Sequence, residues 1–146
     1  MKRNRQSGVT LIEMLIVVTI VALLAGIAVP GVTSGLDRLR LVQASDSVVA
    51  FLNSGLNRAE RRQEPVEITI DPKQRSLSLR GRETEKKLTL PTGVEIRLEE
   101  TRRFLLLPGT PPPRLGLELA NARGVRRVVS IDPLTGTPQI TEPEVK

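Results

Sequence analysis

The segment RQSGVTLIEMLIVVTIVALLAGIAVPGV, residues 5–32, decides how this chain is built. After Arg5 the segment is almost wholly apolar, yet it contains one carboxylate, Glu13. An ionised carboxylate costs at least a few kcal/mol in the centre of a bilayer. The residues around Glu13 therefore have to explain why it stands there.

The apolar run is long enough to cross a membrane. Residues 14–36 contain no ionisable side chain. At ~1.5 Å per residue they form about 35 Å of helix, against a hydrocarbon core of ~30 Å. The run exceeds the roughly 7–15 apolar residues of a secretory signal peptide, and too little chain remains to enclose it as a soluble core helix. We therefore predict that residues 9–36 are the transmembrane half of a helix. The basic side chains of Lys2, Arg3 and Arg5 predict a cytoplasmic amino terminus.

The composition of the 146 residues argues against an enzyme. The chain has no histidine and no cysteine, which excludes the usual zinc sites, Ser-His-Asp triads and thiol chemistry. Its four aspartates, at positions 37, 46, 71 and 132, lack the spacing of a calcium loop. We expect no catalytic residue, no metal and no cofactor. A signal-anchored periplasmic enzyme remains an alternative, in which Glu13 would have no function.

The sequence from Ser7 to Glu13, SGVTLIE, resembles the class III signal of type IV pilins and type II secretion pseudopilins. The resemblance implies that a prepilin peptidase removes the basic leader, residues 1–8, by cutting after Gly8, and then methylates the new amino terminus at Val9. Pro30 falls where family members commonly also have proline, and we expect it to kink the helix. The chain departs from the family at Val9, where phenylalanine or methionine is usual.

This resemblance gives Glu13 a function. In the assembled filament, Glu13 of one subunit would pair with the terminal ammonium at Val9 of a neighbour, and Thr10 would add a hydrogen bond. A charge pair in a low dielectric is favourable only when its geometry is good, and removing one partner leaves the other stranded. The pair would therefore set the stagger of neighbouring subunits. The alternative is that Glu13 snorkels to lipid headgroups.

The helix is predicted to continue as an amphipathic half, residues 37–63. Its apolar side chains recur at helical spacing, at Leu39, Val42, Val49, Leu52, Leu56 and Ala59. We predict one helix over residues 9–62 that ends before Pro65 and packs by its second half on a globular domain.

Residues 64–146 are predicted to form this domain as an antiparallel β-sheet or sandwich. Short runs of period two alternate with turn residues, and predict strands at 66–70, 76–79, 87–90, 94–98, 104–107, 115–119, 125–131 and 139–140. The fold class is therefore α+β, pilin-like, with a long amino-terminal helix packed on an antiparallel β domain.

The order of one long helix followed only by strands resembles that of the H-class minor pseudopilins (GspH/FimT-like). Residues 59–66 and 126–136 look like the helix-to-strand junction and closing hairpin of that class. The resemblance implies a minor pseudopilin that initiates or caps the type II secretion pseudopilus for protein export across the outer membrane. It implies a single-pass inner-membrane protein with a periplasmic carboxyl-terminal domain. Its partners would be the prepilin peptidase, inner-membrane lipid before assembly, and other major and minor pseudopilins in a helical filament.

A basic patch at Arg123, Arg126 and Arg127 leaves one alternative open. A minor pilin of a type IV pilus or DNA-uptake machine would use such arginines to bind phosphates weakly. No aromatic residue stands between them to stack on bases, and charged side chains also protect strand edges from unwanted pairing. We therefore favour secretion and do not expect nucleic acid as a partner.

Overall fold

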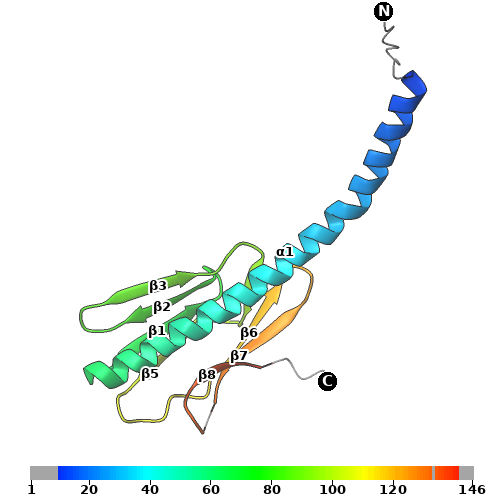
Figure 1. Ribbon diagram of the computed structural model, residues 1–146. Helices are drawn as coiled ribbons and strands as arrows, with labels where there is room; N and C mark the ends of the chain where they lie inside the picture. The colour runs from blue at the N-terminus through cyan, green and yellow to red at the C-terminus, as the bar shows by residue number, and fades with distance from the viewer. Residues whose placement is uncertain (1–9, 133, 142–146) are drawn as a thin grey trace, which may run out of the picture. The chain divides into compact units, whose positions relative to one another are not determined.

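The computed structural model describes residues 10–132 and 134–141. The chain divides into two compact units, residues 1–36 and 37–146, which are described separately below. One helix, α1 (Leu11–Arg62), contributes to both units (Figure 1). Within the described ranges, no helix is long and apolar enough to cross a membrane.

In the first unit, α1 begins with a side-chain cap. The backbone N–H of Glu13 donates to Oγ1 of Thr10 at 3.3 Å, and the N–H of Met14 donates to the Thr10 carbonyl at 3.2 Å. Thr10 is thus the N-cap residue, which lies outside the helix while its side chain satisfies a free N–H of the first turn. This cap explains why α1 begins at Leu11; the predicted start at residue 9 lies outside the described residues.

In the second unit, α1 buries one stripe of side chains. The buried positions follow helical spacing and are Leu41, Ala44, Ser45, Val48, Leu52, Gly55 and Ala59. The stripe is rotated relative to the predicted one, because Leu39 is 51% exposed, while Val42, Val49 and Leu56 are half-buried. The helix ends one residue before Gln63, which has a left-handed φ of 50°. A left-handed residue just past the last turn is a common helix terminator.

The strands of the second unit form two four-stranded sheets in which every pairing is antiparallel. The first sheet has the order β3 (Glu85–Thr89), β2 (Ser76–Arg80), β1 (Val66–Asp71) and β5 (Arg102–Leu106). The second has the order β4 (Val94–Arg97), β6 (Gly116–Asn121), β7 (Arg126–Ile131) and β8 (Pro138–Thr141). The predicted α+β fold class is confirmed, and each predicted strand has a counterpart.

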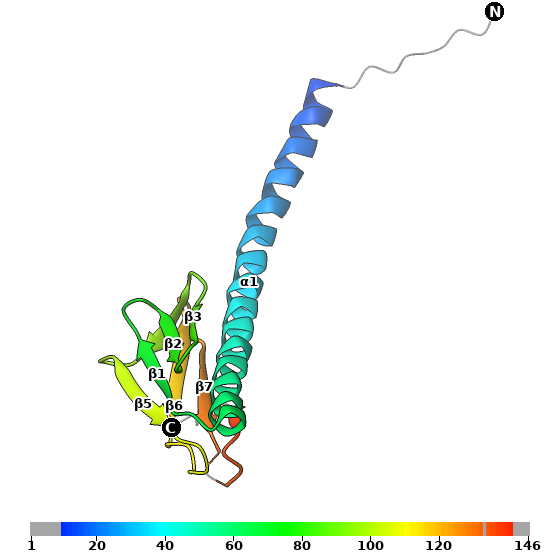
Figure 2. The ribbon, with the colours of Figure 1, turned by 90° about the vertical axis from the view of Figure 1, so that its left-hand side faces the viewer.

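A single hydrophobic cluster joins the helix stripe to both sheets. Strand β1 shows the alternation that causes this, since Val66, Ile68 and Ile70 are buried and the residues between them are not. Gly55 marks the closest approach of the helix. A Cβ placed there would lie 3.0 Å from Cδ1 of Leu79 and 3.1 Å from Cδ1 of Ile68. Figure 2 shows α1 running beside the strands of this unit.

Strand β3 differs from its prediction, since it begins at Glu85 rather than at residue 87 and ends at Thr89. Its residues are exposed except for half-buried Leu88. As an outer strand it needs little apolar surface, so hydrophobic alternation gives a poor signal for its start.

Candidate functional site

The amino-terminal part of α1 exposes its apolar side chains on every side. Between residues 11 and 27, the large hydrophobic side chains are 49–84% exposed, and they are Leu11, Ile12, Met14, Leu15, Ile16, Val17, Val18, Ile20, Val21, Leu23, Leu24 and Ile27. Positions this close in sequence point around the whole circumference of a helix. This surface, which we call the bare helix segment, is far larger than the scattered apolar residues normal on a protein surface.

Thr10 and Glu13 lie together at the start of the bare helix segment. The pattern Thr10-Leu11-Ile12-Glu13 has the spacing of a capping box, in which a threonine N-cap is followed three residues later by glutamate. Glu13 is exposed, and its negative charge in the first turn is favourable at the positive end of the helix dipole. Glu13 therefore has a function within its own helix that the sequence interpretation missed, although the signal was present.

Three of the residues singled out from the leader motif stay predictions. Gly8 and Val9, the predicted cleavage and methylation positions, lie outside the described residues. Pro30 lies within α1, and its predicted kink stays a prediction. The proposed function of this motif therefore depends on the sequence and on the described residues that follow it.

The structure places Arg123, Arg126 and Arg127 at the hairpin that joins β6 to β7. The Nε of Arg123 lies 3.1 Å from Oδ2 of Asp37, and the Nε of Arg126 lies 3.4 Å from Oε1 of Glu118. Two of the three cations thus have a carboxylate beside them. These pairs lower the positive potential of the predicted patch, which makes it a weaker phosphate-binding surface than the sequence suggested.

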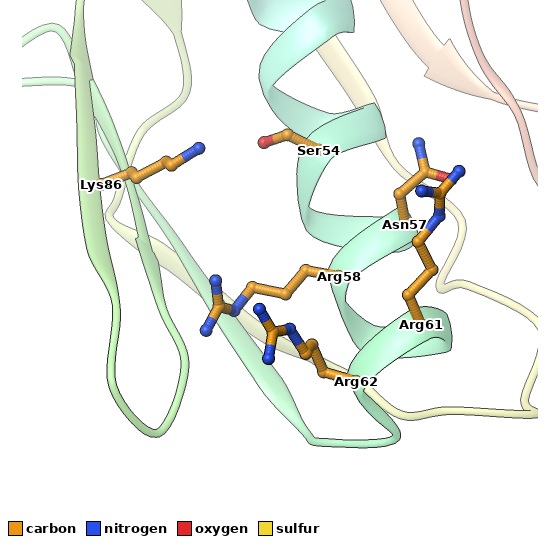
Figure 3. Close-up of a pocket in the computed structure, with 6 residues that line it drawn as sticks. All are labelled: Ser54, Asn57, Arg58, Arg61, Arg62 and Lys86. Carbon is orange, nitrogen blue, oxygen red and sulfur yellow. The ribbon is translucent and has the colours of Figure 1, made fainter.

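A second basic cluster, which the sequence interpretation missed, surrounds a cavity of about 380 Å³. We call it the basic pocket, and it is lined by Ser54, Asn57, Arg58, Arg61, Arg62 and Lys86 (Figure 3). Five of these residues come from the last turns of α1, and Lys86 comes from β3. The residues Arg61 and Arg62 stand out in the sequence, but only the fold brings Lys86 to the same pocket. Figure 3 shows Lys86, Arg58 and Arg62 on one side of the helix and Arg61 with Asn57 on the other.

Arg58 differs from the other cations of the basic pocket because it is anchored. Its Nε donates to Oε1 of Glu64 at 2.7 Å, and the two side chains are 22% and 12% exposed. Gly81 covers this pair so closely that a Cβ there would lie 3.0 Å from Oε1 of Glu64. Arg58 therefore serves mainly to hold the end of the helix, and the remaining cations are left for other partners.

Asp132 stabilises the turn between β7 and β8. Its Oδ1 accepts hydrogen bonds from the N–H groups of Thr135 at 3.1 Å and Leu134 at 2.7 Å. These backbone donors hold the pKa of Asp132 below its usual value. No group of three or more histidine, cysteine, aspartate or glutamate residues in the described part of the chain is placed to hold a metal ion. Asp132 is therefore a turn residue rather than a candidate ligand.

Two comparisons with known proteins identify the family to which this chain is similar. Residues 3–29 match the family model described as the prokaryotic N-terminal methylation motif. Type II secretion system protein H of Xanthomonas campestris pv. campestris is 31% identical over 101 residues, which cover 69% of this chain and 58% of that protein. The chain thus spans little more than half the length of this relative. No solved structure matches the chain significantly.

Proposed function

We propose that this chain, whose methylation motif and relative support a pseudopilin of the GspH class, is a minor subunit that initiates or caps a type II secretion pseudopilus. The matching motif and the 31% identical relative confirm the predicted resemblance to this family. Members of the family are structural subunits and are not known as enzymes. The position of the chain in the filament is our inference.

The observation that carries the proposal is the bare helix segment. Its large apolar side chains are all at least 49% exposed, and burying such a side chain fully stabilises by roughly 1.5–3 kcal/mol. Packing the segment among the same segments of neighbouring subunits would bury all its sides at once. A helix that is apolar around its whole circumference needs such surroundings.

Before assembly, lipid would cover the same surface. The motif and the relative suggest a protein anchored in the inner membrane, and we propose a single pass with a cytoplasmic amino terminus and a periplasmic second unit. The transmembrane assignment of residues 9–36 stays a prediction. A prepilin peptidase would cut after Gly8 and methylate Val9.

Glu13 would then act in two ways. Within the subunit its negative charge lies in the first turn of α1, at the positive end of the helix dipole, and between subunits its exposed carboxylate would pair with the ammonium at Val9 of a neighbour. Thr10 already accepts a hydrogen bond from Glu13 through its hydroxyl oxygen. A hydroxyl has one donor and two acceptor positions, so Thr10 keeps its O–H donor and one acceptor position for the filament contact.

The proposal is tested by separating the charge of Glu13 from its capping function. Glu13→Gln keeps a residue that is acceptable in a capping box but removes the charge. We expect it to reduce the amount of this chain recovered with other pseudopilins in the filament fraction by roughly tenfold or more, because an unpartnered buried charge costs several kcal/mol. Glu13→Ala should be at least as defective.

Asp46→Ala is the matched control, since Asp46 is an exposed carboxylate on the same helix. It should assemble as the unchanged chain does. Normal assembly of Glu13→Gln would refute the intersubunit charge pair. Mass spectrometry of the mature chain provides the second check, because an amino terminus other than methylated Val9 contradicts the processing step.

A further inference from the structure

Strand β3 leaves one edge of the first sheet open. Among the strands in residues 10–132 and 134–141, it pairs with β2 alone. Two hydrogen bonds of 2.8 Å flank this ladder, from Gly81 N–H to Thr84 carbonyl and from Leu90 N–H to Arg75 carbonyl. Because backbone groups alternate in an antiparallel pair, these bonds identify the residues whose N–H and C=O groups point away from β2, namely Glu85, Lys87 and Thr89. The edge thus offers backbone donors and acceptors to another strand.

The two central lysines of β3 lie on opposite faces of the sheet. Lys86 stands opposite Leu79 in the register, and directly opposed side chains share a face. Leu79 packs against α1 at Gly55. Lys86 therefore lies on the sheet face that points toward α1, as Figure 3 shows. Lys87 lies on the other face, where its Nζ donates to Oε1 of Gln74 at 2.8 Å.

The basic pocket beside this edge has little negative charge of its own. Glu64 is engaged by Arg58. Among the residues that the structure describes, no ion pair involves Arg61, Arg62 or Lys86. Of these three, Arg62 and Lys86 lie on the same side of the helix as Arg58 (Figure 3). Their positive charges favour the binding of an anionic group.

The open edge and the basic pocket together point to one occupant. We propose that an extended, acidic segment of a partner protein adds to the first sheet beside β3 and places alternate carboxylates in the basic pocket. Strand addition supplies backbone hydrogen bonds, while pockets for alternate side chains supply specificity. Every second residue of such a strand would face the helix, as Lys86 and Leu88 do. The inference depends on the second unit alone and not on the proposed function.

Other anions fit this site less well. An edge of unpaired backbone groups complements another backbone, which neither a lipid headgroup nor a nucleic acid provides. No aromatic side chain lines the pocket to stack on bases.

The test measures binding of a short labelled peptide, in which glutamate alternates with threonine, to the full chain in non-ionic detergent at low salt. Lys86→Gln and Arg62→Gln should each weaken binding roughly threefold, and both together roughly tenfold. Lys87→Gln is the matched control, because it removes the same charge from the same strand on the opposite face. It should leave the affinity unchanged.

Hydrogen exchange tests the added strand independently of charge. Peptide binding should slow exchange of the outward N–H groups of Glu85, Lys87 and Thr89. Lys87→Pro removes one of these donors without removing a bond to β2, and it should weaken binding; circular dichroism establishes whether this variant keeps its fold. Because exchange is followed in the unchanged chain, the test stands even if the proline variant misfolds.

Several results would overturn the proposal. Equal losses in Lys86→Gln and Lys87→Gln would mean unspecific attraction. Binding without protection of the β3 amides would exclude strand addition. Tighter binding of vesicles containing an anionic phospholipid, or of a single-stranded oligonucleotide, would assign the pocket to another class of ligand.

Discussion

The two parts of α1 differ in what covers them. From Leu41 to Ala59 one stripe of the helix is buried against the sheets of its own unit. From Leu11 to Ile27 the apolar side chains are exposed on all sides. Both parts are regular α-helix, so backbone geometry does not distinguish them.

The difference teaches that helix formation and helix burial have separate causes in this chain. The second part has a polar outer face and one partner, which the same chain supplies. The first part has no polar face, so a single partner on one side would leave most of its apolar surface exposed. Only lipid or several neighbouring helices can surround it. The second part of the helix is thus buried by the folding of its own unit, whereas the first part keeps its apolar side chains exposed.

The largest expected effect tests the difference between the two parts of α1 by making the same substitution in each part. Leu52 is 1% exposed and Leu24 is 62% exposed. Leu52→Ala should lower the free energy of unfolding of the second unit by about 2–5 kcal/mol, because it leaves a cavity. The chain has no tryptophan or tyrosine, so hydrogen exchange of the core amides in β1 and β6 is a suitable measurement.

Leu24→Ala is the matched variant, and it should change the same unfolding free energy by less than about 0.5 kcal/mol. Its effect should appear in filament assembly. Equal losses of unfolding free energy in the two variants would contradict the division between folding and assembly.

A smaller change in stability is expected when a side chain is enlarged in each part of the helix instead of being shortened. Gly55 has side-chain carbons 3.0–3.4 Å from the position of an added Cβ, whereas Gly35 has nothing within 4 Å. Gly55→Leu should therefore destabilise the second unit by about 1–3 kcal/mol, because the helix must move away from the sheet. Denaturation followed by circular dichroism measures the change. Gly35→Leu, the control, should unfold at the same denaturant concentration as the unchanged chain.

The smallest effect is expected at the surface of the second unit, where Asp132 closes the last turn. Its pKa is lower in the folded chain, so its contribution to stability is complete above the unfolded-state pKa and is lost as the pH falls through the lower folded value. Asp132→Ala should lower the unfolding midpoint at neutral pH. The difference from the unchanged chain should shrink as the pH falls below the ordinary value of 3.8. A difference that grows in acid would contradict this.

Much of the fold could be predicted because period-two and helical patterns are strong where one face is buried. Strand β1 alternates cleanly, and its predicted and observed starts coincide at Val66. The prediction was less accurate for β3, whose residues are mostly charged and exposed. Leu39 was wrongly included in the buried stripe, because helical spacing alone does not determine which of two neighbouring stripes faces the sheet.

The candidate sites were predictable only where their residues are close in sequence. Thr10 and Glu13 are three positions apart, and their capping box could have been recognised from the sequence. The basic pocket could not, because Lys86 and Arg62 come to line the same pocket only through the packing of the first sheet on the helix. The partners of Arg123 and Arg126 were missed for the same reason, since Asp37 and Glu118 are brought to them by the fold.

The cap at Thr10 has a consequence for the removal of the leader. A cut after Gly8 leaves Val9 as the only residue ahead of the cap, so the new ammonium forms next to the positive end of the helix dipole. That proximity is unfavourable by about 0.3–1 kcal/mol. The carboxylate of Glu13 in the first turn offsets both the charge of the ammonium and the positive end of the helix dipole. Under the proposed function, this processing would change the electrostatic environment of Glu13 within its own subunit, before any neighbour binds.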